Sequence, residues 1–87
     1  MYSMVYDKNA VKDIPKLKMA KLDKKVEALI DLMRENPFQS LPPYEKLQGD
    51  LQGAYSRRIN IKHRLVYEVV EDQQTVKIIS MCTHYEH

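Results

Sequence analysis

The sequence predicts an α+β fold in which two N-terminal helices pack on one face of an antiparallel sheet of about four strands. Apolar residues recur at helical spacing in the first half of the chain, whereas they alternate with polar residues in the second half. The connecting segment 37–53 separates the halves and contains three prolines and both glycines. For a chain of 87 residues, we expect a single domain over 1–87.

The N-terminal half opens with a short strand over 1–6, whose tyrosines and valine favour extended backbone. Asp7 or Asn9 then caps the first helix. Pro15 interrupts the helical pattern, because an interior proline removes a backbone donor and clashes with the preceding turn. This helix therefore either kinks near Asp13 or begins close to Pro15.

The second helix is the clearest element and spans 22–35. Its apolar residues follow one another at i, i+4, i+7, i+8 and i+11, which forms one continuous face: Leu22, Val26, Leu29, Ile30 and Met33. Asn36 followed by Pro37 ends the helix, because the residue before a proline avoids helical geometry.

The C-terminal half shows strand alternation over 55–61 and again over 64–70, with a polar turn at 71–74. The residues expected on the core side are Tyr55, Ile59, Ile61, Leu65, Tyr67 and Val69. The run 75–83 is the most apolar part of the chain, so we expect it to be the central strand, buried on both faces.

The composition limits where the protein acts. No stretch approaches the ~20 apolar residues that span a bilayer, and the N-terminus lacks the pattern of a signal peptide. The single cysteine, Cys82, cannot form an internal disulfide, which agrees with a reducing compartment. We therefore expect a cytoplasmic protein without membrane association.

The positive charge is concentrated rather than large. The formal net charge is only +2, but five basic residues fall between positions 57 and 64: Arg57, Arg58, Lys62, His63 and Arg64. A local basic cluster supplies phosphate contacts even when the overall charge is small. Arg57, Lys62 and His63 are therefore candidates for RNA binding, and a merely solvated hairpin is the alternative.

Two of these arginines are expected to form a pair. If the hairpin turn centres near Ile61, Arg58 and Arg64 are cross-strand neighbours on the face opposite the helices. Two adjacent guanidiniums repel each other unless an anion such as a phosphodiester lies between them. A register slip of one residue would instead send one arginine to the core side, and a pair that is simply solvated is the alternative.

Further candidates for chemistry are few. His84, directly after the last strand, has a side chain suited to acid–base work near neutral pH, although a frayed terminus is the alternative. The three histidines and one cysteine show no zinc spacing, and there is no acidic cluster for magnesium and no phosphate loop. We expect no metal and no cofactor, so any hydrolysis must come from acid–base groups and arginines.

The segment 51–69 resembles the hallmark of the Txe/YoeB toxins, in which an L-x-G-x-(aromatic)-S-R-R-I run leads into H-R-L-V-Y. The closing Thr83-His84-Tyr85 resembles the C-terminal His-Tyr of that family. Asn36-Pro37-Phe38, followed by Glu45-Lys46-Leu47, resembles its loop, although Lys46 replaces a proline and two residues follow Tyr85. The resemblance covers about two-thirds of the chain.

The resemblance implies a RelE-like microbial RNase fold and the toxin component of a type II toxin–antitoxin system. Such a toxin is a ribosome-dependent endonuclease that cleaves mRNA in the A site and is neutralised by a YefM/Axe-type antitoxin. Whether the toxin also forms a homodimer is left open. Carried over by position, Glu45 is the general base, His84 the general acid, Arg58 and Arg64 hold the phosphate, and Tyr85 orients the substrate.

Three other functions stay open. A toxin of the same fold that inhibits gyrase would have no use for the arginine pair or the terminal His-Tyr. A non-catalytic RNA-binding module would bind RNA without cutting it. A plain structural domain would leave Arg58 and Arg64 unexplained.

Overall fold

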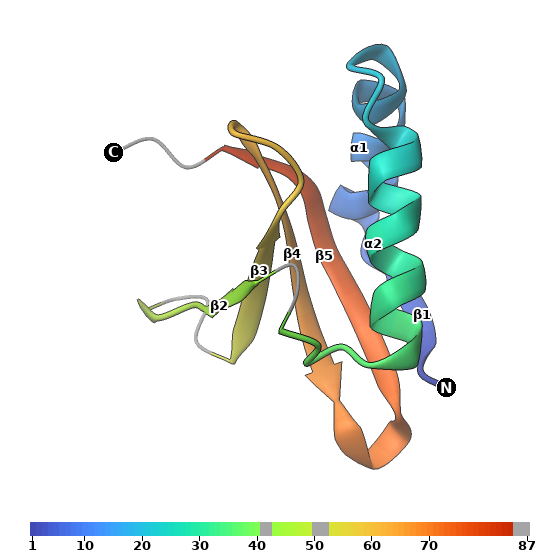
Figure 1. The fold of residues 1–87 in the computed structure, drawn as a ribbon, viewed down its shortest axis with the longest axis vertical. Helices are drawn as coiled ribbons and strands as arrows, with labels where there is room; N and C mark the ends of the chain where they lie inside the picture. The colour runs from blue at the N-terminus through green and yellow to red at the C-terminus, as the bar shows by residue number, and fades with distance from the viewer. Residues whose placement is uncertain (41–42, 50–52, 85–87) are drawn as a thin grey trace.

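The computed structural model describes residues 1–40, 43–49 and 53–84, with residues 82–84 described by their backbone alone. It contains two helices, α1 (Lys8–Met19) and α2 (Asp23–Glu35), and a sheet of five strands. The strands are β1 (Ser3–Tyr6), β2 (Tyr44–Lys46), β3 (Ala54–Arg58), β4 (His63–Val70) and β5 (Thr75–His84), and a 3-10 turn, η2 (Glu71–Gln73), joins the last two. Both helices lie on one side of the sheet, as Figure 1 shows, so the predicted α+β class is confirmed.

The sheet differs from the prediction in number and direction of strands. The order is β1-β5-β4-β3-β2, and β1 runs parallel to β5 while the other pairs are antiparallel, so the sheet is mixed. The fifth strand is β2, which lies inside the segment expected to be only connecting. Three residues are too few to show a period of two, and β2 is held by its pairing with β3 rather than by its own pattern.

Of the two alternatives for α1, a start close to Pro15 is wrong. It begins at Lys8, directly after Asp7, and continues through Pro15 to Met19. The carbonyl that loses its partner at Pro15 belongs to Val11, an exposed residue at 53% relative accessibility, where water can replace the missing donor. The helix therefore tolerates its proline because that turn lies at the surface.

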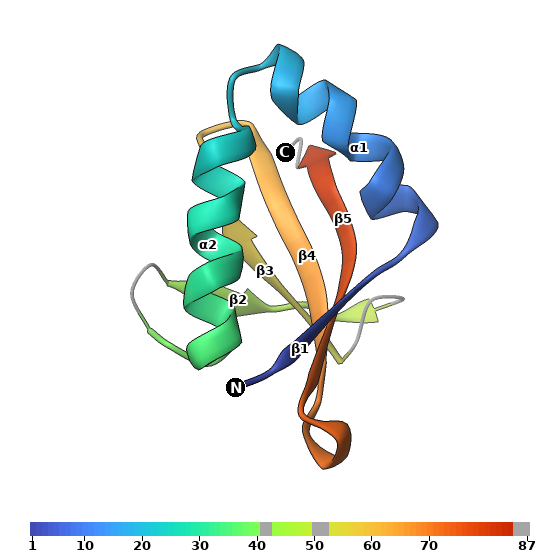
Figure 2. The same cartoon turned by 90° about the vertical axis from the view of Figure 1, so that its right-hand side faces the viewer.

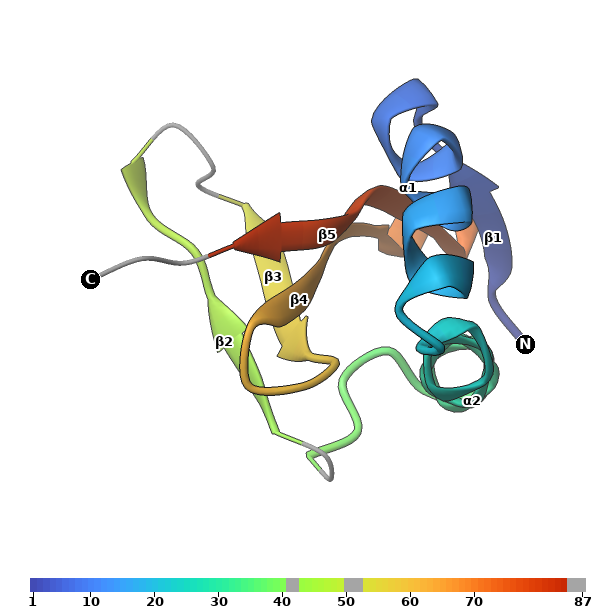
Figure 3. The same ribbon diagram turned by 90° about the horizontal axis from the view of Figure 1, so that it is seen from above.

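The core lies between the helices and the sheet. The expected face of α2 is confirmed, since Val26, Leu29, Ile30 and Met33 are all buried, and Leu22 packs against them. Figures 2 and 3 show both helices on the same side of the sheet, and β4 and β5 contribute five residues to the core there. These are Leu65, Tyr67, Val76, Ile78 and Met81.

Two expectations about the strands were wrong. Ile61 is 89% exposed, because β3 ends at Arg58 and Ile61 lies in the turn beyond the core. Strand β5 does lie between two neighbours, but it is not buried on both faces: Val76 and Ile78 face the core while Lys77 between them is exposed. Because both helices lie on one face, the other face of β5 is open to water at Lys77.

Candidate functional site

The turn between β3 and β4 holds the hairpin in the expected register. Arg58 and Arg64 are cross-strand partners, which confirms the predicted pair. The side-chain oxygen of Asn60 accepts hydrogen bonds from the backbone N–H groups of Lys62 at 2.9 Å and His63 at 2.7 Å. These bonds close the turn locally and accompany the register in which Arg58 lies opposite Arg64.

A hollow of about 760 Å³ lies beside the arginine pair, between the end of the hairpin and α2. Its lining residues from the strands and turn are Glu45, Ser56, Arg58, Ile59, Asn60, Ile61 and Arg64, and those from α2 are Lys25, Ala28, Leu29 and Leu32. The arginines thus share a hollow with a helix, whereas we expected them to face away from both helices. Alternation along a strand separates the two faces of the hairpin but does not say which of them a helix will cover, so the sequence could not place this hollow.

Glu45 reaches this hollow through β2. Its backbone pairs with that of Ser56, which lies two residues before Arg58 on β3. Its Oε2 lies 3.5 Å from Nη1 of Arg64. The Glu45 side chain is 66% exposed, whereas that of Arg64 is only 18% exposed. An ion pair this exposed adds little stability. Its structural effect is to place a solvent-accessible carboxylate against a largely buried cation.

Arg57 does not lie on the basic surface where RNA binding was expected. It is 2% exposed, and its guanidinium donates hydrogen bonds to the Tyr67 hydroxyl at 3.1 Å and to the carbonyls of Pro37 at 2.9 Å and Gln39 at 2.7 Å. Adjacent residues of a strand point to opposite faces, so Arg57 enters the interior where Arg58 faces the hollow. Arg57 is therefore committed to holding residues 37–39 against the sheet.

Tyr67 completes this buried cluster. Burial raises the pKa of its hydroxyl above 10, and the nearby charge of Arg57 and the hydrogen bond from it act in the opposite direction. The hydroxyl also donates to the Pro37 carbonyl at 3.2 Å. The guanidinium of Arg57 lies 5.0 Å from the centre of the Tyr44 ring, which ties the start of β2 to the same cluster.

The two other candidates for RNA binding lie at the surface end of the hairpin. Lys62 is exposed in the turn, and His63 is half-buried at the start of β4. Nδ1 of His63 lies 3.1 Å from the Asn60 side-chain oxygen. Because that oxygen can only accept, Nδ1 carries the hydrogen in this contact, and Nε2 is the acceptor when the ring is neutral.

The expected general acid lies near the same end of the sheet. The backbone of His84 pairs with that of His63, and Thr83 pairs with Arg64, so the end of β5 lies beside the start of β4, as Figure 1 shows. Tyr85 falls outside the described residues. The structure therefore brings together Glu45, Arg58 and Arg64 around one hollow, with the backbone of His84 on the adjacent strand.

Ser56 is a polar residue of this hollow that sequence reasoning missed. Ser56 is 1% exposed, and its hydroxyl has no hydrogen-bond partner among the residues that the structure describes. A buried hydroxyl without a partner is unusual in a folded protein. Its place two residues before Arg58 in an alternating strand was the signal available in the sequence.

Two properties of the described part of the chain bear on other kinds of site. Among the side chains that the structure describes, those of residues 1–40, 43–49 and 53–81, no three His, Cys, Asp or Glu are grouped as a metal site would need. Over the same ranges, no helix is both long enough and apolar enough to cross a membrane.

Residues 6–85 match the family described as YoeB-like toxin of bacterial type II toxin-antitoxin system. The chain is also 40% identical over 65 residues to a Toxin YoeB of Streptomyces coelicolor, which covers 75% of each protein.

Solved structures agree over nearly the whole chain. A YoeB/ParE toxin from Agrobacterium tumefaciens superposes with a TM-score of 0.84 at 32% identity, covering 95% of this chain and 99% of that one. The toxin in a heterotetrameric YoeB–YefM complex from Staphylococcus aureus gives 0.80 at 33% identity, covering 98% and 99%. The sequence family and the fold therefore agree.

Proposed function

The chain belongs to the YoeB-like toxin family of bacterial type II toxin–antitoxin systems, and from that premise we propose that it is a ribosome-dependent endonuclease that cleaves mRNA in the A site. The observation that carries the proposal is the convergence of Glu45, Arg58 and Arg64 on one hollow. A carboxylate base beside two cationic groups is what cleavage of a phosphodiester by acid–base chemistry requires.

The arginine pair supplies the electrostatic part of the mechanism. Arg58 and Arg64 are opposite each other on neighbouring strands, and Glu45 offsets only one of the two positive charges. A bound phosphodiester would bring the compensating negative charge. As charge grows on the phosphoryl oxygens in the transition state, fixed guanidiniums stabilise it more strongly than they stabilise the ground state.

The proton transfers fall to Glu45 and His84. Glu45 removes the proton from a ribose 2′-hydroxyl, whose oxygen attacks the adjacent phosphorus while the bond from phosphorus to the 5′-oxygen breaks. His84 gives its proton to that leaving oxygen, and Tyr85 orients the substrate. The product carries a cyclic phosphate, or a 3′-phosphate after hydrolysis. DNA is not cleaved, because it lacks the attacking hydroxyl.

The remaining surface and the partner fit this activity. Lys62 and His63 lie at the end of the hairpin beside the hollow and are proposed to contact phosphates of the message or of ribosomal RNA. A YefM/Axe-type antitoxin is the proposed inhibitor, in keeping with the Staphylococcus aureus relative that is solved with YefM. A homodimer is the other proposed assembly, and the cytoplasm is the proposed site of action.

The direct test is cleavage of a defined mRNA on programmed ribosomes, compared with the same mRNA without ribosomes. The wild type should cut at the A-site codon only when ribosomes are present. His84→Ala and Glu45→Gln should each lower the rate by ~10²–10⁴-fold, the usual contribution of a general acid or base. Glu27→Gln, which changes an exposed carboxylate on α2, is the matched control and should leave the rate unchanged.

A folded wild-type protein, freed of antitoxin, that does not cut mRNA on ribosomes would overturn the proposal. Inhibition of DNA supercoiling by gyrase would then be the next activity to assay. Saturable binding of RNA without strand scission would instead identify a non-catalytic RNA-binding module.

A further inference from the structure

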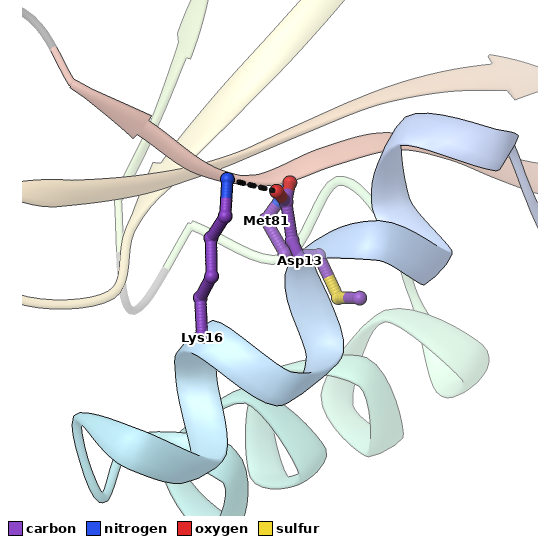
Figure 4. A network of polar contacts seen from close by, with 3 residues as sticks. All are labelled: Asp13, Lys16 and Met81. Carbon is purple, nitrogen blue, oxygen red and sulfur yellow. Dashed lines mark hydrogen bonds and ion pairs between the residues drawn. The ribbon is translucent and has the colours of Figure 1, made fainter.

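Helix α1 carries a buried carboxylate that the proposed chemistry does not use. Asp13 is 9% exposed, and its Oδ2 accepts a hydrogen bond from the backbone N–H of Met81 on β5 at 2.9 Å. Lys16, one turn further along α1, lies 3.8 Å from the other carboxylate oxygen. Figure 4 shows both side chains extending from α1 towards β5 at this point. Asp13 is thus a side-chain acceptor for a backbone donor of the sheet.

Met81 lies in a part of β5 where the ladder with β4 is irregular. Tyr67 pairs with Ile78, Val66 with Ser80, and Arg64 with Thr83. Strand β5 therefore advances by five residues over a stretch in which β4 advances by three. Such β-bulges leave backbone groups of the longer strand without a partner in the ladder. A buried N–H in that position needs another acceptor, and the Asp13 carboxylate is one.

The bulges also change which face of β5 meets the helices. Val76 and Ile78 are buried in the core, and regular alternation would place Ser80 there next. Instead Met81, at 2% exposure, is the next residue of the core cluster. The hydrogen bond from the Met81 N–H to Asp13 therefore lies where the alternation of buried and outward-facing side chains along β5 shifts by one residue.

The register beyond the bulges depends on this shift. If the ladder continued regularly from Tyr67 and Ile78, His63 would pair with Cys82. With the bulges, His63 pairs with His84. The difference is two residues, or about 7 Å along the strand. A shift of two residues leaves the residue opposite His63 on the same face of the sheet. It moves the expected general acid along the strand by more than the length of a hydrogen bond.

We propose that Asp13 is a positioning residue for His84: its carboxylate holds the Met81 N–H in the bulged segment of β5, and this fixes the register that places His84 opposite His63. The catalytic part of this proposal rests on the function proposed above. The register part does not, since it concerns the backbone alone.

The test compares Asp13→Ala, which removes the acceptor, with Asp13→Asn, which keeps an oxygen at the same place. In Asp13→Ala we expect loss of the inter-strand nuclear Overhauser effects between the His63 and His84 backbones, and a kcat at least tenfold lower, towards the ~10²–10⁴-fold attributable to an acid. The KM for programmed ribosomes should stay within about twofold, because Arg58 and Arg64 are untouched. Asp13→Asn should restore both the cross-strand signals and most of kcat.

Lys16→Ala is the matched control, because it removes only the neighbouring cation, whose side chain is 70% exposed. It should leave the register and kcat unchanged. In the wild type, the Met81 amide should exchange with solvent deuterium as slowly as the core amides of β5.

Three results would overturn the proposal. The first is a folded Asp13→Ala protein that keeps the His63–His84 signals and its kcat. The second is an Asp13→Asn protein as impaired as Asp13→Ala. The third is loss of the fold in both Asp13→Ala and Asp13→Ser, which would make Asp13 a residue of global stability. A wild type that shows the signals but cuts no mRNA would instead sink the proposed function and leave the register role standing.

Discussion

Replacing Arg57 by methionine is expected to lower the free energy of unfolding by about 3 kcal/mol. The substitution keeps a long side chain in the interior but removes three hydrogen bonds, to the Tyr67 hydroxyl and to the carbonyls of Pro37 and Gln39. Hydrogen bonds from a charged donor contribute about 1.5–3 kcal/mol each, so the gross loss is roughly 4–9 kcal/mol. Part of this is offset, because a buried guanidinium no longer has to be desolvated.

Equilibrium unfolding in urea at 25 °C measures this effect, and Arg58→Met is the matched control. The two arginines are neighbours, but Arg58 is exposed at the hollow, so its replacement should change the free energy of unfolding by less than about 0.5 kcal/mol. For a domain of this size, the difference corresponds to a Tm lower by roughly 12–24 °C in Arg57→Met. Equal stabilities for the two variants would refute the structural role assigned to Arg57.

Three other predictions concern single positions. Lys21 has a left-handed backbone, φ 59°, after the end of α1, so Lys21→Gly should stabilise the protein by about 0.5–1 kcal/mol. Lys12→Gly inside the helix should instead destabilise it by about 1 kcal/mol. Thermal unfolding of both variants tests whether the two changes in stability have opposite signs. Because burial raises the pKa of Tyr67, its contribution to stability is complete below pH ~10 and falls as the pH rises through the higher folded-state pKa. Absorbance titration of the phenols should show one late step that Tyr67→Phe removes, and an unchanged curve would contradict the assignment. Asn60→Ala should cost about 1–2 kcal/mol in urea unfolding, because the turn loses the acceptor of two backbone N–H groups, and an unchanged midpoint would show that the strands alone fix the hairpin.

The sequence predicted well those elements whose signal lies in consecutive residues. The buried face of α2 follows from five apolar positions at helical spacing, and the pairing of Arg58 with Arg64 follows from the alternation on either side of a short turn. Both depend on local geometry, which the chain carries within a few residues. The face on which this pair opens was not anticipated, because it depends on where α2 packs against the hairpin.

Features that depend on distant partners were not predictable in this way. Strand β2 is three residues long and exists through its pairing with β3, so nothing within it revealed that Glu45 would lie next to Arg64. The charge of Arg57 indicated the surface, although alternation with Arg58 placed it on the core side. Its burial needs the carbonyls of residues 37 and 39, which lie 18 to 20 positions away in the sequence.

The order of the strands makes the complete sheet depend on β5. The last strand to be made, β5, lies between β1 and β4, and the first strand pairs with it in parallel through Ser3 to Tyr6 and Thr75 to Ile78. Until β5 is available, β1 has no neighbour in the sheet, and Asp13 of α1 has no Met81 N–H to accept a hydrogen bond from. Domains usually begin to fold from the N-terminus during translation, and pairings across the whole chain length form late. A nascent chain of this toxin therefore lacks the complete five-stranded sheet, and the contact between Asp13 and Met81, until β5 has left the ribosome.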